Sequence, residues 1–141
     1  MAANFLFDTG AILAILNEKD TWHAVCTETF HRLPFPGLTS EAVLTEVFHL
    51  VNRSRTEMES VWGFIDSGVV AVATIANSEL PQVHSLMTRY RDRPMDFADA
   101  TLVYLAGRES LNVVFTVDHA DFATYRMKGN RRFQILPLER P

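Results

Sequence analysis

The chain has 141 residues, of which 48% are hydrophobic and 21% are charged, a composition typical of a single globular domain spanning residues 1–141. Its formal net charge of −4 at pH 7 argues against a protein that holds nucleic acid by phosphate neutralisation alone, unless bound cations assist. The single cysteine excludes an internal disulfide bond, and the sequence has neither an apolar run of membrane-spanning length nor a basic signal-peptide start, so we expect a cytoplasmic protein without a membrane partner.

Apolar strands and helical patterns alternate along the chain. The predicted elements are, in order, a strand at Asn4–Asp8, a helix at Ala11–Asn17 after a Thr9-Gly10 turn, a helix from Asp20 to Leu33, an extended piece at Leu38–Ser40, helices at Glu41–Asn52 and Thr56–Ser67, a strand at Val69–Thr74, a helix at Glu79–Arg91, a break at Arg91–Pro94, a helix at Phe97–Ser110, a strand at Asn112–Val117, a helical turn at Ala120–Arg126 and a strand at Arg132–Leu136. This order predicts a three-layer α/β/α fold with a mostly parallel sheet of four to five strands.

Two of the predicted strands end at an aspartate, Asp8 after NFLF and Asp118 after VVFTV. Each aspartate could simply cap the helix that follows it. In open parallel sheets, however, ligands bind at the carboxyl ends of the strands. If the two strands are neighbours, the two carboxylates repel each other, and a cation between them is expected.

A third carboxylate, Glu46, lies beside an apolar helical stripe. It follows Val43 by three residues and precedes Leu50 by four, so it borders the inner face of its helix rather than the solvent. A carboxylate in this position either pairs with an arginine or takes part in a functional site.

The segment PMDFADA adds two more acids, Asp96 and Asp99, at the start of a helix. Asp96 is expected to be the N-cap, and Asp99 lies one turn into the helix on the same face. Acidic side chains without histidine or cysteine partners are hard oxygen ligands, which suit Mg²⁺ or Mn²⁺ better than zinc. We therefore expect Asp99 to join the other acids around a divalent cation.

Four segments together carry a family resemblance: FLFDTGAILAIL, VLTEVFHL, PMDFADATLVYLA and VVFTVDHADFATYR. In this order and spacing, the chain resembles the PIN domain, and in particular the VapC toxins of bacterial toxin–antitoxin pairs. By position, the resemblance implies Asp8, Glu46, Asp99 and Asp118 as catalytic and metal-binding acids, Thr9 and Thr116 as hydroxyls beside them, and Asp96 and Asp121 as supporting acids. The sequence departs from the usual pattern at Gly10, where serine or asparagine is frequent, and at His119 and Ala120, where more basic residues are common.

The resemblance implies an endoribonuclease that uses one or two Mg²⁺ or Mn²⁺ ions to activate a water molecule against an RNA phosphodiester bond. It also implies a homodimer and a cognate antitoxin protein. The alternative is a non-catalytic PIN-like module that binds RNA or protein, which predicts the loss of one or more acids. Receiver-like and dehalogenase-type phosphoryl-transfer domains are disfavoured, because the first strand ends in one acid and Gly10 stands where a second would be needed.

One segment near the C-terminus concentrates positive charge. Its basic residues are Arg126, Lys128, Arg131 and Arg132. They are candidates for RNA contact because they follow the Asp118 segment closely. An ordinary solvated turn around Gly129-Asn130 is the competing interpretation.

Overall fold

We analysed a computed structural model of the chain, which describes residues 2–93 and 95–141. These residues form a five-stranded sheet with the order β3-β2-β1-β4-β5, and every pair of neighbouring strands is parallel. The strands are β1 (Leu6–Phe7), β2 (Gly37–Ser40), β3 (Val70–Ala73), β4 (Val113–Phe115) and β5 (Gln134–Leu136). The helices are α1 (Thr9–Leu16), α2 (His23–Phe30), α3 (Glu41–Val51), α4 (Arg55–Asp66), α5 (Leu80–Arg89), α6 (Phe97–Glu109) and α7 (His119–Thr124), with a 3₁₀ turn η1 (Asn77–Glu79) before α5.

The central strands are apolar because both faces of the sheet are covered. β1 lies between β2 and β4, and its register pairs Leu6 with Val114 and Phe7 with Phe115. The rings of Phe7 and Phe115 stack with their centroids 5.6 Å apart, and both side chains are fully buried. The core is therefore built around the two strands that precede Asp8 and Asp118.

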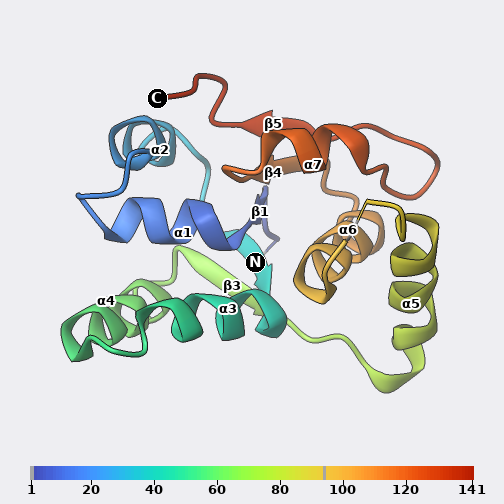
Figure 1. The fold of residues 1–141 in the computed structure, drawn as a ribbon, viewed down its shortest axis with the longest axis horizontal. Coiled ribbons are helices and arrows are strands. Elements are labelled where there is room, and N and C mark those ends of the chain that lie inside the picture. The colour runs from blue at the N-terminus through green and yellow to red at the C-terminus, as the bar shows by residue number, and fades with distance from the viewer. Residues whose placement is uncertain (1, 94) are drawn as a thin grey trace.

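The chain reverses its direction across the sheet between β1 and β4. From β1 it moves outward through β2 to β3, and it then crosses back to β4 and continues to β5 on the other side. In the view of Figure 1, α1, α2 and α4 lie to the left of the sheet, whereas α5 and α6 lie to the right. A reversal of strand order opens a crevice at the carboxyl ends of the two strands concerned, and this is the usual ligand position in such folds.

The predicted fold class is confirmed, and the mostly parallel sheet proves to be entirely parallel in the described residues. Two helix starts were predicted wrongly. Helix α1 begins at Thr9 rather than after a Thr9-Gly10 turn, because the Asp8 side chain accepts a hydrogen bond from the Thr9 amide and starts the helix there. Helix α2 begins at His23, since Asp20 accepts from the Trp22 amide in a local turn instead of capping the helix directly.

The remaining differences lie at element ends. Helix α2 ends at Phe30 rather than Leu33, and the last helical segment, α7, ends before Arg126. The break predicted at Arg91–Pro94 extends to Pro94, which lies outside the described residues. No helix in the described part of the chain is both long enough and apolar enough to span a membrane.

Candidate active site

Asp8 occupies the carboxyl end of β1 and is 4% exposed. One of its oxygens, Oδ1, accepts a hydrogen bond from the Thr9 amide at 2.8 Å, and Oδ2 accepts from the Thr116 hydroxyl at 2.6 Å. Asp8 therefore does cap α1, but the cap uses only one of its oxygens. Burial raises the pKa of Asp8 to about 6, and the charges of Asp118 and Glu46 contribute to the rise.

Thr116 connects the ends of the two central strands. Its hydroxyl donates to Asp8 and accepts a hydrogen bond from the Asp118 amide at 2.9 Å. The pairing of β1 with β4 thus places Asp118 next to Asp8, as expected for two neighbouring strand ends. The Asp118 side chain makes no capping hydrogen bond to α7, so the capping interpretation does not apply to it. Burial raises the pKa of its carboxyl group, and Asp121 and Asp96 add to the effect.

Glu46 enters the same region from the middle of α3. Its Oε1 accepts a hydrogen bond from the Thr9 hydroxyl at 2.6 Å, and the structure gives it no arginine partner among the described residues. Partial burial raises the pKa of Glu46, opposed by the Thr9 hydrogen bond and increased by the neighbouring charges of Asp96 and Asp118. The two threonines therefore each fix one acid of the cluster.

Asp99 lies one turn into α6 and is 9% exposed. Its Oδ2 accepts a hydrogen bond from the hydroxyl of Tyr125 at 2.9 Å, and its amide donates to Oδ1 of Asp96, the N-cap of α6, at 2.8 Å. Burial and the charges of Asp8 and Asp96 raise the pKa of Asp99 to about 8. Burial together with the Asp99 charge also raises the pKa of Tyr125 far above its ordinary value, so Tyr125 remains a neutral hydrogen-bond donor.

These perturbed pKa values have a common origin. Each carboxyl group of the cluster is at least partly desolvated, and each feels the negative charge of at least one other member. Groups perturbed by burial and by like charges concentrate at functional sites. The acids predicted from the sequence, Asp8, Glu46, Asp99 and Asp118, are thus brought together at the carboxyl edge of the sheet, and Asp96 lies with them.

Asp121 is held differently from the other acids. Its Oδ1 forms an ion pair with Nε of Arg93 at 3.0 Å, and both side chains are partly exposed. Its charge raises the pKa of Asp118, so Asp121 is close enough to influence the cluster while its own charge is balanced by Arg93. The pairing of Asp121 with Arg93 was not predicted from the sequence.

Gly10 and His119, where the sequence departs from the usual family pattern, both lie against buried or half-buried neighbours. Gly10 departs from the usual serine or asparagine because a Cβ at this position would overlap the side chain of Val117. His119 is half-buried against Trp22, with the two ring centroids 5.3 Å apart. Tyr125, which lies in the DFATYR segment, was not singled out from the sequence, although a tyrosine so close to an acidic segment is a possible hydrogen-bond donor to it.

The basic residues of the 126–132 segment do not form one surface. Arg126 folds back, and its Nη1 donates to the backbone carbonyls of Ala123, Thr124 and Tyr125 at 2.9–3.1 Å, so it caps the end of α7. Lys128, Arg131 and Arg132 are exposed around a turn in which Gly129 and Asn130 have positive φ angles.

The donor set suits a hard divalent cation by its chemistry, because it consists of carboxylate oxygens held together against their own repulsion. Within residues 2–93 and 95–141, no three acidic, histidine or cysteine side chains already enclose a metal-sized position. One oxygen of Asp99 is engaged by Tyr125, and both oxygens of Asp8 are engaged by hydrogen-bond donors. By the type and charge of their oxygen donors, the residues nevertheless fit Mg²⁺ or Mn²⁺.

The PIN domain family profile matches residues 5–127, which contain the whole acid cluster and all but the last strand of the sheet. The chain therefore belongs to the PIN domain family.

Three known proteins are similar to it. Ribonuclease VapC26 of Mycobacterium tuberculosis is 28% identical over 134 residues, which cover 94% of this chain and 99% of VapC26. The crystal structure of VapC20, a sarcin–ricin loop cleaving toxin of M. tuberculosis, is similar with a TM-score of 0.73 and 24% identity, covering 84% of this chain and 94% of that one. VapBC2 of Rickettsia felis, solved with a DNA fragment from its promoter, matches with a TM-score of 0.65 and 13% identity over 93% of this chain and 97% of that one.

Proposed function

We propose that the chain is a metal-dependent endoribonuclease that acts as the toxin of a toxin–antitoxin pair. The observation that carries the proposal is the acid cluster of a PIN domain, complete and located where the strand order reverses. Asp8 and Asp118 follow the two strands at that reversal. The names of the similar proteins, a ribonuclease and a sarcin–ricin loop cleaving toxin, support RNA as the substrate. The alternative, a non-catalytic module that only binds RNA or protein, predicts the loss of one or more acids, and this chain has all of them.

Asp8, Glu46, Asp99 and Asp118 would hold one or two Mg²⁺ or Mn²⁺ ions. When bound, such an ion supplies positive charge that lowers the pKa of a coordinated water and stabilises charge on the reacting phosphate. Because the acids repel each other, the cluster is a high-energy arrangement in the absence of a cation, and this repulsion favours cation binding.

The chain's own residues orient the acids. The Thr116 hydroxyl and the Thr9 amide fix both oxygens of Asp8, and the Thr9 hydroxyl fixes one oxygen of Glu46. The Tyr125 hydroxyl fixes one oxygen of Asp99 in the same way. Hydrogen bonds of this kind restrict the rotation of carboxylates that would otherwise turn away from each other, so they preorganise the site.

The proposal is tested by incubating the purified protein with total RNA in millimolar Mn²⁺ or in EDTA and by mapping the new RNA ends. We expect cleavage in Mn²⁺ that is abolished by EDTA and by Asp8→Asn or Asp99→Asn. Asp66→Asn is the matched control, because Asp66 is exposed at the end of α4, far from the cluster in sequence. Normal cleavage by Asp8→Asn, or cleavage that persists in EDTA, would contradict the assignment.

The proposed partners are an antitoxin protein and a second copy of the chain. The similarity to a VapBC complex supports the antitoxin, and the negative charge of the acid cluster favours an antitoxin that presents basic side chains to it. Co-expression with any small open reading frame found to adjoin the gene is expected to yield a stable complex without ribonuclease activity. Light scattering of the isolated chain is expected to give the mass of a dimer, and a monomeric mass would contradict that part of the proposal.

A further inference from the structure

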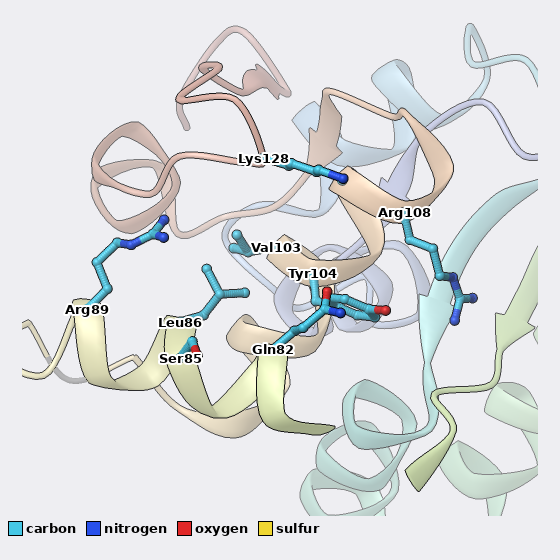
Figure 2. A pocket seen from close by; sticks show the side chains of 9 residues that line it. Gln82, Ser85, Leu86, Arg89, Val103, Tyr104, Arg108 and Lys128 are labelled. Atoms are coloured by element: carbon cyan, nitrogen blue, oxygen red, sulfur yellow. The ribbon is translucent and has the colours of Figure 1, made fainter. Parts of the chain in front are cut away.

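A second polar pocket of about 530 Å³ lies between α5, α6 and the loop that follows α7. Figure 2 shows Arg89 entering from α5 and Lys128 from the loop, with Tyr104 of α6 in the same pocket. None of the residues that line it is acidic, although the chain as a whole carries a net charge of −4. Three basic side chains therefore line the pocket of a negatively charged protein, and Glu79 and Glu109 adjoin it through their ion pairs with Arg108.

The cations of this pocket differ in how far their charge is available. Arg108 is paired, with Nη1 3.0 Å from Glu79 and Nε 2.8 Å from Glu109. Neither Arg89 nor Lys128 takes part in an ion pair within the described residues, and both are exposed. Arg89 and Lys128 thus carry positive charges that no ion pair within the described residues neutralises, and an anionic ligand in the pocket would neutralise them.

The neutral residues of the pocket narrow the chemistry of that ligand. Gln82 and Ser85 line it with side-chain hydrogen-bonding groups, and Tyr104 is partly buried there. The Tyr104 hydroxyl donates to Glu79, which also pairs with Arg108, so the Tyr104 ring is held on the Arg108 side of the pocket. Cations, neutral polar groups and an aromatic side chain are the combination that binds single-stranded nucleic acid, through its phosphates and through base stacking.

The pocket is also aligned with the acid cluster along α6. Asp99, Val103 and Gly107 follow each other at intervals of four residues, so they lie on one side of the helix, and Val103 and Gly107 line the pocket. With a rise of about 1.5 Å per residue, the helix separates Asp99 from Gly107 by about 12 Å along its axis. A short stretch of RNA backbone can span such a distance.

We propose that this pocket binds the sugar–phosphate backbone of RNA beside the bond that is cut, with Arg89 and Lys128 contacting phosphates and Tyr104 stacking on a base. The inference rests on the proposed ribonuclease function and adds a binding subsite to it. Among the basic residues of the 126–132 segment, it assigns RNA contact to Lys128.

The test compares a single strand of about 16 nucleotides, a length within reach of one such binding surface, with a dinucleotide. Binding of the longer strand is measured in EDTA for the variants Arg89→Gln and Lys128→Gln. The matched controls are Arg53→Gln and Lys19→Gln, which remove the same charges from exposed positions outside this pocket. Each pocket variant is expected to reduce the slope of log affinity against log salt by about 0.7, the value for one single-strand phosphate contact, and the controls are expected to leave the slope unchanged.

Tyr104 is tested by Tyr104→Phe, which keeps the ring, and by Tyr104→Leu, which removes it. We expect only the leucine variant to weaken binding, by roughly tenfold, in line with the loss of one stacked base. In Mn²⁺, the pocket variants are expected to raise KM for the longer strand more than they raise KM for the dinucleotide.

The outcomes separate the two proposals. If the wild-type protein cleaves RNA but the pocket variants bind the longer strand with unchanged affinity and salt dependence, the subsite is wrong and the function stands. If a polyglutamate peptide competes with the strand at equal charge concentration, the pocket recognises acidic protein rather than RNA, and the subsite is again wrong. If the wild-type protein neither binds nor cleaves RNA, both proposals fail.

Discussion

Replacing Asp99 by asparagine is expected to stabilise the metal-free protein while abolishing its activity. The folded state binds the Asp99 proton far more tightly than the unfolded chain does, because burial and neighbouring charges raise the pKa from 3.8 to about 8. Where the folded state binds more protons than the unfolded state, the free energy of unfolding falls as pH rises. The cost of ionising Asp99 is therefore small near pH 4 and fully developed at about pH 8.

The magnitude follows from the pKa difference. At roughly 1.4 kcal/mol per pH unit, ionising a single isolated group with these pKa values costs an upper limit of about 6 kcal/mol at alkaline pH. Neighbouring carboxyl groups share the repulsion and can take up protons instead, so we expect Asp99→Asn to gain about 1–3 kcal/mol at pH 8. Asparagine can still accept the hydrogen bond that Tyr125 donates, so no buried donor is left unpaired.

The measurement is urea unfolding in EDTA at pH 8 and at about pH 5, with Asp66→Asn as the exposed control. The gain for Asp99→Asn is expected to shrink to below about 1 kcal/mol at the lower pH, because Asp99 is already protonated in the folded state there. Millimolar Mn²⁺ is expected to stabilise the wild type and to have little effect on Asp99→Asn. A loss of stability at pH 8, or an equal gain at both pH values, would refute the reasoning.

Three further predictions concern the surroundings of the cluster. Thr116→Val removes a hydrogen bond that lowers the pKa of Asp8, so Mn²⁺ affinity measured by calorimetry is expected to fall about 10–100-fold; unchanged affinity would remove Thr116 from the site. Gly10→Ala places a methyl group against Val117 and is expected to cost about 1–3 kcal/mol in urea unfolding, with recovery in the double variant that also carries Val117→Ala. Arg93→Ala breaks a partly exposed ion pair, so the free energy of unfolding should change by less than about 1 kcal/mol. The carboxylate it leaves unpaired should shift the acidic limb of the pH–rate profile upward, and a superimposable profile would count against this.

The sequence was sufficient to predict the fold class and the position of the central acids. Runs such as NFLF and VVFTV are short, apolar and followed at once by an aspartate, and the parallel sheet makes their ends neighbours. Helical spacing placed Glu46 beside the apolar stripe of α3, in which Val43 is fully buried although Leu50 is 63% exposed. These patterns lie within a few residues along the chain, whereas the pairing of β1 with β4, which makes Asp8 and Asp118 neighbours, is a long-range contact that the structure supplies.

The partners of the acids could not be predicted in the same way. Tyr125 donates to Asp99 across 26 positions, and Arg93 pairs with Asp121 across 28 positions. Which hydroxyl or guanidinium group reaches a carboxylate depends on how helices and loops pack, and no local pattern encodes it. The start of α1 was also predicted wrongly. Thr9-Gly10 is a turn by residue type, but the Asp8 cap makes it the first turn of a helix.

The hydrogen bond between Thr116 and Asp8 joins positions 108 residues apart, and this has a consequence for synthesis of the protein. Asp8 is synthesised 108 residues before Thr116, whose hydroxyl orients it, and parallel pairing of β1 with β4 requires both segments. A nascent chain that stalls or terminates before Thr116 therefore has no assembled acid cluster. Under the proposed ribonuclease function, an unfinished copy would therefore lack the site that cuts RNA.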